Sequence, residues 1–141
     1  MIKRIAHIGI AVKNLGLSQD LFSKLLGNGF PHTEMVEEQN AVISFYPLGD
    51  SSIELIQAAD FSGAGSAITT FIEKRGEGIH HICLEVDDIE KEIERLKSIG
   101  FQFTSGAPFA GSSGCRVAFM HPKSTNGVLI ELSQPIESKK A

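Results

Sequence analysis

The hydrophobic and polar positions in the first half of the chain predict a strand, a helix and two further strands. Residues 5–12 form an apolar run rich in β-branched side chains, which is typical of a buried strand. Residues 41–48 and 52–57 predict two strands joined by the tight turn Gly49-Asp50. Between the first of these strands and the other two, Asn14 and Gly27 can begin and end a helix. The apolar residues of this helix recur at helical spacing: Leu17, Leu21, Phe22, Leu25 and Leu26.

The second half repeats this order of elements. A linker at 62–66 leads into a short helix with Ile68, Phe71 and Ile72 on one side. After it, residues 79–86 predict a strand, and Asp88 and Gly100 can begin and end a helix. The remaining predictions are three strands, at 101–103, 116–120 and 127–133, with a turn at 121–126 before the last one.

A direct comparison of the two halves shows an internal repeat. Residues 6–12 match residues 80–86 in pattern, and this match places His7 on His81. Later, Glu54 and Glu131 occupy equivalent positions in two similar apolar runs. Two copies of one supersecondary unit follow from such a repeat. We therefore predict an α+β fold, with module one at about 1–60 and module two at about 76–135 of a single domain covering 1–141.

Composition excludes several classes of protein. The net charge is −4 and no basic block occurs, which argues against a nucleic-acid partner. The apolar run at 5–12 is too short and too polar to span a membrane. Only two cysteines are present, Cys83 and Cys115, so the chain is no disulfide scaffold. We expect a reducing, cytoplasmic location.

Each half carries one histidine on its first predicted strand and one glutamate on its last: His7 with Glu54, and His81 with Glu131. Side chains alternate between the two faces of a strand. This alternation places all four residues on the face away from the apparent helix-packing face of each half. Two halves that face each other across a pseudo-twofold axis would then bring two imidazoles and two carboxylates together.

These four side chains predict a site for one divalent metal ion. A buried carboxylate is costly unless it is paired or metal-bound, and two neighbouring carboxylates repel each other. A divalent cation removes both problems, histidine suits transition metals, and open positions could accept substrate oxygens. A single strand histidine is more often a hydrogen-bonded core residue, and a single glutamate is usually solvated. The repetition of the His/Glu set is what favours the metal.

At these residues the sequence resembles the vicinal-oxygen-chelate superfamily, which includes glyoxalase I. Three stretches carry the resemblance: residues 6–12, residues 76–82, and residues 121–123 together with 127–132. The first stretch is common to the superfamily. The other two look most like the methylmalonyl-CoA epimerases within it.

The resemblance implies paired βαβββ modules that form a cupped, barrel-like sheet, which is the glyoxalase/bleomycin resistance protein fold. It places the metal ligands at His7, Glu54, His81 and Glu131. It also implies a divalent ion, with cobalt preferred and zinc, manganese or nickel as alternatives. The remaining expectations are an acyl-CoA substrate and a homodimer.

The implied reaction interconverts (2R)- and (2S)-methylmalonyl-CoA by proton exchange through a metal-stabilised enolate. Glu131 is the candidate for both a ligand and a catalytic base. Ile43 stands where some relatives carry a proposed catalytic glutamate, so Glu38 or a metal-bound water is the candidate for the other face of the substrate. Lys123 and Arg116 are candidates for contacting the CoA phosphates.

Strand parity turns His80 away from His81, which predicts core packing for His80 instead of metal ligation.

Two other functions stay open at this point. Glyoxalase I would use the same ligand set to isomerise a hemithioacetal. A metal-free drug-binding resistance protein would have no need of the repeated His/Glu set.

Overall fold

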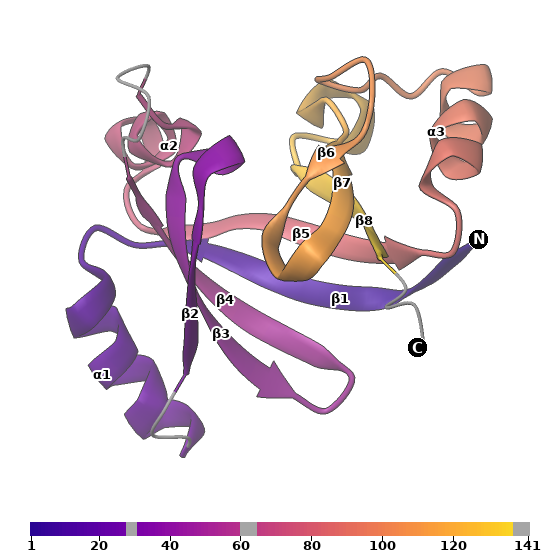
Figure 1. The fold of residues 1–141 in the computed structure, drawn as a ribbon. Coiled ribbons are helices and arrows are strands. Elements are labelled where there is room, and N and C mark those ends of the chain that lie inside the picture. The colour runs from indigo at the N-terminus through magenta and orange to yellow at the C-terminus, as the bar shows by residue number, and fades with distance from the viewer. Residues whose placement is uncertain (28–30, 60–64, 137–141) are drawn as a thin grey trace. The chain divides into compact units, whose positions relative to one another are not determined.

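A computed structural model describes residues 1–27, 31–59 and 65–136 of the chain (Figure 1). The chain divides into two compact units. We call His7–His80 the first unit, and Met1–Ala6 together with His81–Ala141 the second unit. The boundaries fall within two strands, β1 between Ala6 and His7 and β5 between His80 and His81, so the units differ from the predicted modules in their ends but share their order of elements.

The first unit contains the predicted strand, helix and strands, followed by the predicted short helix. Its elements are β1 (Ile2–Ala11, of which His7–Ala11 lies in this unit), α1 (Leu15–Leu26), β2 (His32–Val36), η1 (Glu37–Gln39), β3 (Ala41–Leu48), β4 (Ser51–Ala58) and α2 (Ala67–Arg75). Of the predicted linker at 62–66, residues 62–64 lie outside the described residues.

The second unit repeats this order of elements, and its last three strands are shorter than their counterparts in the first unit. Its elements are β5 (Gly78–Val86, entering the unit at His81), α3 (Ile89–Ser98), β6 (Phe109–Ala110), η2 (Ser112–Gly114), β7 (Cys115–Phe119), η3 (Pro122–Thr125) and β8 (Ile130–Pro135). In place of the predicted strand at 101–103, only Phe103 forms an isolated bridge, with Met120.

Both units arrange their strands in the same way. The strand order is β2-β3-β4-β1 in the first unit and β6-β7-β8-β5 in the second. In each, the first strand pairs in parallel with the last strand, and the others pair antiparallel. The two copies of one unit predicted from the repeat, and the α+β class with the paired βαβββ modules that the resemblance implies, are confirmed.

Helix α1 begins and ends where its sequence signals predict. The Asn14 side chain accepts a hydrogen bond from the Leu17 N–H, and Gly27 adopts the left-handed conformation that favours glycine at a helix C-terminus. The helix covers one face of the first unit's sheet through Leu15, Phe22 and Leu26, which pack around Tyr46 and Leu55 among others. Three leucines of the same helix are instead exposed on its outer side: Leu17, Leu21 and Leu25.

Helix α2 covers part of the opposite face of the same sheet. Ile68, Phe71 and Ile72, the residues predicted on its apolar side, pack with Ile43 and Ile56 in a separate cluster. The first unit therefore buries apolar side chains on both faces. The part of this second face that carries His7 and Glu54 lies further along the strands.

Helix α3 packs on one face of the second unit's sheet. Val86, Ala118 and Leu132 from three strands meet Ile89 and Leu96 of the helix in one buried cluster. Asp88 caps the helix by accepting a hydrogen bond from the Lys91 N–H at 3.1 Å, as predicted. The other face of these strands is thus left for His81 and Glu131.

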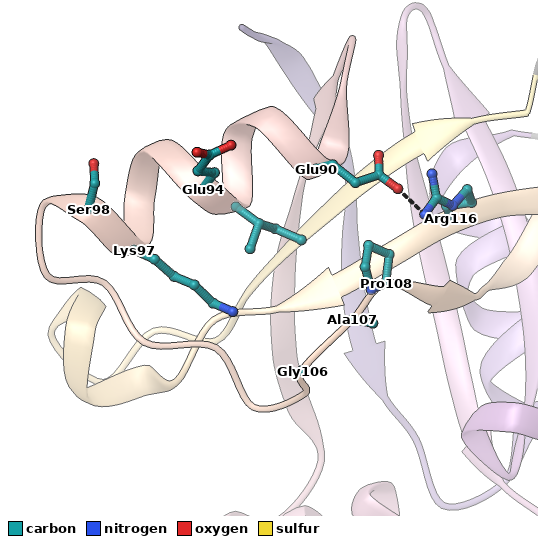
Figure 2. A pocket seen from close by; sticks show the side chains of 9 residues that line it. Glu90, Glu94, Lys97, Ser98, Gly106, Ala107, Pro108 and Arg116 are labelled. Carbon is teal, nitrogen blue, oxygen red and sulfur yellow. Dashed lines mark hydrogen bonds and ion pairs between the residues drawn. The ribbon is translucent and has the colours of Figure 1, made fainter.

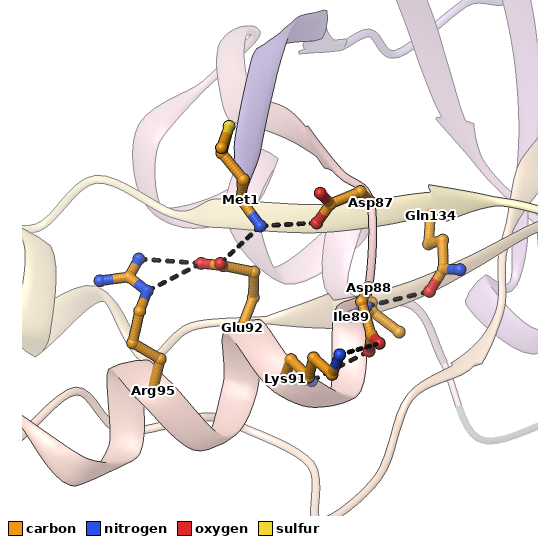
Figure 3. A network of polar contacts seen from close by, with 8 residues as sticks. All are labelled: Met1, Asp87, Asp88, Ile89, Lys91, Glu92, Arg95 and Gln134. Atoms are coloured by element: carbon orange, nitrogen blue, oxygen red, sulfur yellow. Dashed lines mark hydrogen bonds and ion pairs between the residues drawn. The ribbon is translucent and has the colours of Figure 1, made fainter.

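A polar network joins the start of the chain to helix α3 (Figure 3). The Met1 amino group lies 2.8 Å from Glu92, whose carboxylate also receives two hydrogen bonds from Arg95. Hydrogen bonding from Arg95, and then from the Met1 amino group, holds the pKa of the buried Glu92 carboxyl below its usual range.

Within the described residues, no helix is long and apolar enough to cross a membrane.

We expect Glu92→Gln to lower the melting temperature at neutral pH, because the charged form makes the stronger hydrogen bonds. A loss of about 1 kcal/mol corresponds to about 2–4 °C for a chain of this size. The lowered pKa means that this stabilisation is fully present above about pH 4.3, the ordinary glutamate pKa, and is lost as pH falls further. Thermal unfolding from pH 7 to pH 3 should therefore show the gap between wild type and variant closing in acid. Glu94→Gln, on an exposed side of the same helix, is the control, and a gap that widens in acid would contradict the assignment.

Candidate active site

His7 and Glu54 come together on the first unit's sheet. Nδ1 of His7 forms an ion-pair contact with Oε2 of Glu54, and the carboxylate side chain is only 3% exposed. In the register of β1 and β4, Gly9 pairs with Glu54, so His7 reaches Glu54 along one face of adjacent parallel strands. Ile53 and Leu55, the neighbours of Glu54, belong to the cluster beneath α1 on the other face. The predicted parity is confirmed for this pair.

His81 and Glu131 form the equivalent pair in the second unit. Nε2 of His81 lies 2.9 Å from Oε2 of Glu131, and both side chains are 5% exposed. Glu131 faces Cys83 across the β5–β8 pairing, and Cys83 lies two residues beyond His81 on the same face. The flanking residues Ile130 and Leu132 pack toward α3. Each predicted His/Glu pair is therefore assembled within its own unit.

Aromatic side chains fix the His81 ring. Phe119 meets it edge to face, with ring centroids 5.8 Å apart and an interplanar angle of 83°. Phe119 is the register partner of Glu131 on β7 and stacks in turn on Phe109 at 6.1 Å. Such packing restricts the rotamers available to the imidazole and keeps water away from its contact with the carboxylate.

The burial of these pairs sets their chemistry. An ionised carboxylate removed from water costs several kcal/mol unless hydrogen bonds and charge offset the loss. Each pair offers one imidazole nitrogen and one carboxylate oxygen, which are ligand types that divalent transition metals accept. The same carboxylates could remove a proton from a carbon acid, because water does not compete strongly at a buried site. The donor set therefore fits the predicted metal.

His80 is placed differently from His81. Its ring meets Phe71 of α2 edge to face at 5.0 Å. Strand alternation separates it from the face of His81. The structure thus agrees with the prediction that His80 packs in the core.

Arg116 lies on the helix side of the second unit's sheet, not on the face of Glu131. Its guanidinium forms an ion pair with Glu90 of α3, and both residues line a groove with a volume of about 720 Å³ (Figure 2). On β7 it alternates with Val117 and Phe119, of which Phe119 pairs with Glu131. The structure does not bring Arg116 to the other candidate residues.

Lys123 is exposed on η3, the turn predicted at 121–126. There the His121 side chain accepts a hydrogen bond from the Lys123 backbone N–H.

Ile43 occupies the site face of the first unit, where it is 2% exposed. It pairs with Ile56 on β4, and Ile56 shares a face with Glu54. No proton-transfer group is therefore present at the position to which sequence reasoning assigned a missing glutamate. Glu38, the candidate replacement, is exposed in η1 and lies outside the sheet.

Glu34 is a site-face residue that sequence reasoning missed. It lies on the edge strand β2, directly opposite Ile43. Residues opposite each other in an antiparallel pair project from the same face. Only Glu34 and Val36 of β2 turn away from solvent, and the short segment carries no apolar alternation from which the strand could be predicted.

Comparison with known proteins gives one family and several close relatives. Residues 6–119 match the model of the glyoxalase/bleomycin resistance protein/dioxygenase superfamily. An ethylmalonyl-CoA/methylmalonyl-CoA epimerase of Cereibacter sphaeroides is 40% identical over 95% of this chain and 99% of that protein. A mitochondrial methylmalonyl-CoA epimerase of Dictyostelium discoideum is 37% identical over 94% of this chain and 79% of that protein. A solved Streptomyces coelicolor methylmalonyl-CoA epimerase variant in complex with 2-nitronate-propionyl-CoA has a TM-score of 0.86 and 30% identity, covering 97% of this chain and all (100%) of that one.

Proposed function

This chain belongs to the glyoxalase/bleomycin resistance protein/dioxygenase superfamily, and within it we propose that the protein interconverts (2R)- and (2S)-methylmalonyl-CoA. The observation that carries the proposal is the pair of buried His/Glu contacts, one on each repeated sheet. The named epimerases similar to it over nearly its whole length supply the substrate class, an acyl-CoA thioester.

We propose that His7, Glu54, His81 and Glu131 together hold one divalent metal ion, with cobalt preferred over zinc, manganese or nickel. Support comes from the donor types and from the burial of Glu54, His81 and Glu131, while the His7 side chain is 12% exposed. A divalent ion bound there supplies Lewis acidity, which makes the proton between a carboxylate and a thioester carbonyl more acidic. The Glu54 carboxylate already contacts His7 and can orient that imidazole.

Glu131 is the residue that we assign to proton transfer. Its carboxylate is buried and oriented by His81, so it can take a proton from the substrate carbon without competition from bulk water. Lys123, exposed at the turn before β8, is the better candidate for a CoA phosphate, because Arg116 is engaged by Glu90. Lysine suits this task as a point charge on a flexible stem.

The metal proposal predicts about one divalent ion per chain after purification with metal supplied, because the four ligands form a single donor set. Elemental analysis of the protein gives the stoichiometry and the identity of the ion. Removal with a chelator should lower activity, and re-addition should restore it. A metal-free protein that remains fully active would contradict the proposal.

An activity panel tests the choice of substrate. Purified protein is given methylmalonyl-CoA in one assay and the hemithioacetal of methylglyoxal and glutathione in another. We expect turnover of methylmalonyl-CoA alone. Turnover of only the hemithioacetal would indicate the glyoxalase I reaction. Turnover of neither substrate by protein that takes up no divalent ion when metal is supplied would favour a drug-binding resistance protein.

Three further properties belong to the same proposal. We propose that the two units belong to a single domain covering 1–141, and the family match across residues 6–119 supports this. Residues Leu17, Leu21 and Leu25 leave an exposed apolar stripe on α1, which supports a homodimer. Neither Cys83 nor Cys115 forms a disulfide with a described residue, which supports the cytoplasmic location that we propose.

A further inference from the structure

We propose that Gln57 and Gln134 are positioning residues, which hold the two His/Glu pairs in the geometry that metal binding requires. Each glutamine ties the last strand of its own unit to the start of the helix that follows the first strand. This role rests on the proposed function, because it assigns the two pairs to a divalent ion.

The same hydrogen bond occurs in both units. In the first unit, the Leu15 N–H at the start of α1 donates to Oε1 of Gln57 on β4 at 2.6 Å. In the second unit, the Ile89 N–H at the start of α3 donates to Oε1 of Gln134 on β8 at 2.9 Å (Figure 3). Each glutamine stands three residues after the glutamate of its unit, and each helix starts eight residues after the histidine. The bond and the proposed ligands therefore share one spacing in both halves of the repeat.

These hydrogen bonds differ from the caps of the same helices. The first N–H groups of a helix have no partner within the helix. At α3 the Asp88 side chain accepts from the Lys91 N–H, while Gln134 accepts from the Ile89 N–H. Asn14 takes the place of Asp88 at α1. The caps are local in sequence, whereas the glutamines lie 42 and 45 residues from their donors, so they connect the helix start to a distant strand.

Alternation along each last strand turns its glutamine and its glutamate to opposite faces. Gln134 lies on the side of α3, and Glu131 lies on the side of His81. The strand is therefore held through one face and presents its carboxylate on the other. Gln57 and Glu54 divide the two faces of β4 in the same way.

The two strands that carry a His/Glu pair are parallel, so no tight turn fixes their relative position. In both units the residue two positions after the histidine is the register partner of the glutamate: Gly9 faces Glu54, and Cys83 faces Glu131. Histidine and glutamate therefore meet on a diagonal, and sliding one strand along the other changes their separation. Metal ligands must lie within about 0.2 Å of their ideal distances. The glutamine bond limits such sliding, because the helix start is only eight residues from the histidine.

The helix start requires an acceptor oxygen from residue 134. Glutamate offers a carboxylate oxygen on a side chain of the same length, and its negative charge is favourable at a helix N-terminus. Methionine has a similar length but its sulfur is only a weak acceptor. Gln134→Glu should therefore keep the bond, and Gln134→Met should break it. Asp88→Ala is the matched control, because it removes the cap of the same helix without touching the link to β8.

Co²⁺ binding to the purified full chain is the first measurement, because the visible absorption of this ion depends on the arrangement of its ligands. We expect Gln134→Met to weaken Co²⁺ binding by about 10-fold or more, as is typical when a residue that supports a metal ligand is lost, and to alter the spectrum. Gln134→Glu and Asp88→Ala should both bind within about twofold of wild type. Gln134→Met and Asp88→Ala should each lower the melting temperature by about 2–4 °C, so the control matches the loss of stability.

The nitrogen resonances of the His81 ring in metal-free protein give a second measurement, which does not depend on the proposed ion. The ring contacts Glu131 at 2.9 Å, so these resonances report the geometry of the pair. Gln134→Met should shift them, whereas Gln134→Glu and Asp88→Ala should leave them as in wild type.

Equal effects of Gln134→Met and Asp88→Ala on both measurements would overturn the positioning role, since they would show a loss of stability alone. Co²⁺ affinity of Gln134→Met within about twofold of wild type would overturn it too. Failure of wild type to bind Co²⁺ would instead overturn the proposed metal site, and the His81 resonances would then decide the role of Gln134. Gln57→Met, with Gln57→Glu and Asn14→Ala beside it, applies the same test to the first unit.

Discussion

Glu131→Ala is expected to lower the rate of methylmalonyl-CoA epimerisation by at least about 10³-fold, since general acid–base catalysis alone contributes about 10²–10⁴. The substitution removes the proposed base and a proposed metal ligand at once. It also deprives His81 of a partner at 2.9 Å in a buried site. The measurement is kcat with saturating substrate, alongside metal content and the melting temperature.

Glu131→Gln separates the two roles of this residue. The amide keeps the size of the side chain and an oxygen that can ligate, but it cannot accept the substrate proton. We expect a smaller loss of metal than in Glu131→Ala, with turnover still lost. Glu94→Ala, on the exposed side of α3, is the control and should remain within about twofold of wild type. Glutamine at 131 with nearly full turnover would contradict the base assignment.

His81→Ala is expected to lose most of its metal and about 10²-fold or more in kcat, because loss of a residue that only supports a ligand already costs about 10–100-fold and His81 is itself a proposed ligand. His81 is 5% exposed and contacts Glu131, whereas its neighbour His80 packs against Phe71. His80→Ala should therefore keep its metal and lose about 1 kcal/mol of stability from the ring contact. The two variants are compared by elemental analysis, kcat and thermal unfolding. Equal loss of metal in both would refute the parity of β5.

The sequence was sufficient for the elements with strong local signals. Asn14, Gly27 and Asp88 lie at helix ends as predicted, because caps depend on single side chains close in sequence. The His/Glu pairs were also predictable. Alternation along β4, β5 and β8 fixes the face of each side chain once the strand is known.

Other features depended on contacts that local patterns do not contain. Strand β2 has only one fully buried residue, Val36, and its edge position lets polar side chains occupy the rest. Helical spacing grouped Leu17, Leu21 and Leu25 with Phe22 and Leu26, yet the sheet covers only part of that wide stripe. Strand β8 begins at Ile130, later than the apolar run suggested, because the turn through η3 takes up the preceding residues.

The same limits applied to the candidate site. Arg116 was proposed for substrate binding from its charge, but strand parity relative to Phe119 and its ion pair with Glu90 place it on the helix side. Glu34 was missed because its face is defined by pairing with Ile43, and that pairing could not be seen before β2 was known. Long-range register, not residue type, decided both cases.

Solvent deuterium incorporation tests the central claim most directly. Wild-type protein is incubated with methylmalonyl-CoA in deuterated water, once loaded with cobalt and once after treatment with a chelator, and the substrate is analysed by mass spectrometry. We predict one deuterium at the carbon between the carboxylate and the thioester, with exchange that falls strongly without metal and returns when cobalt is restored. The absence of metal-dependent exchange in folded, metal-loaded protein would contradict the account.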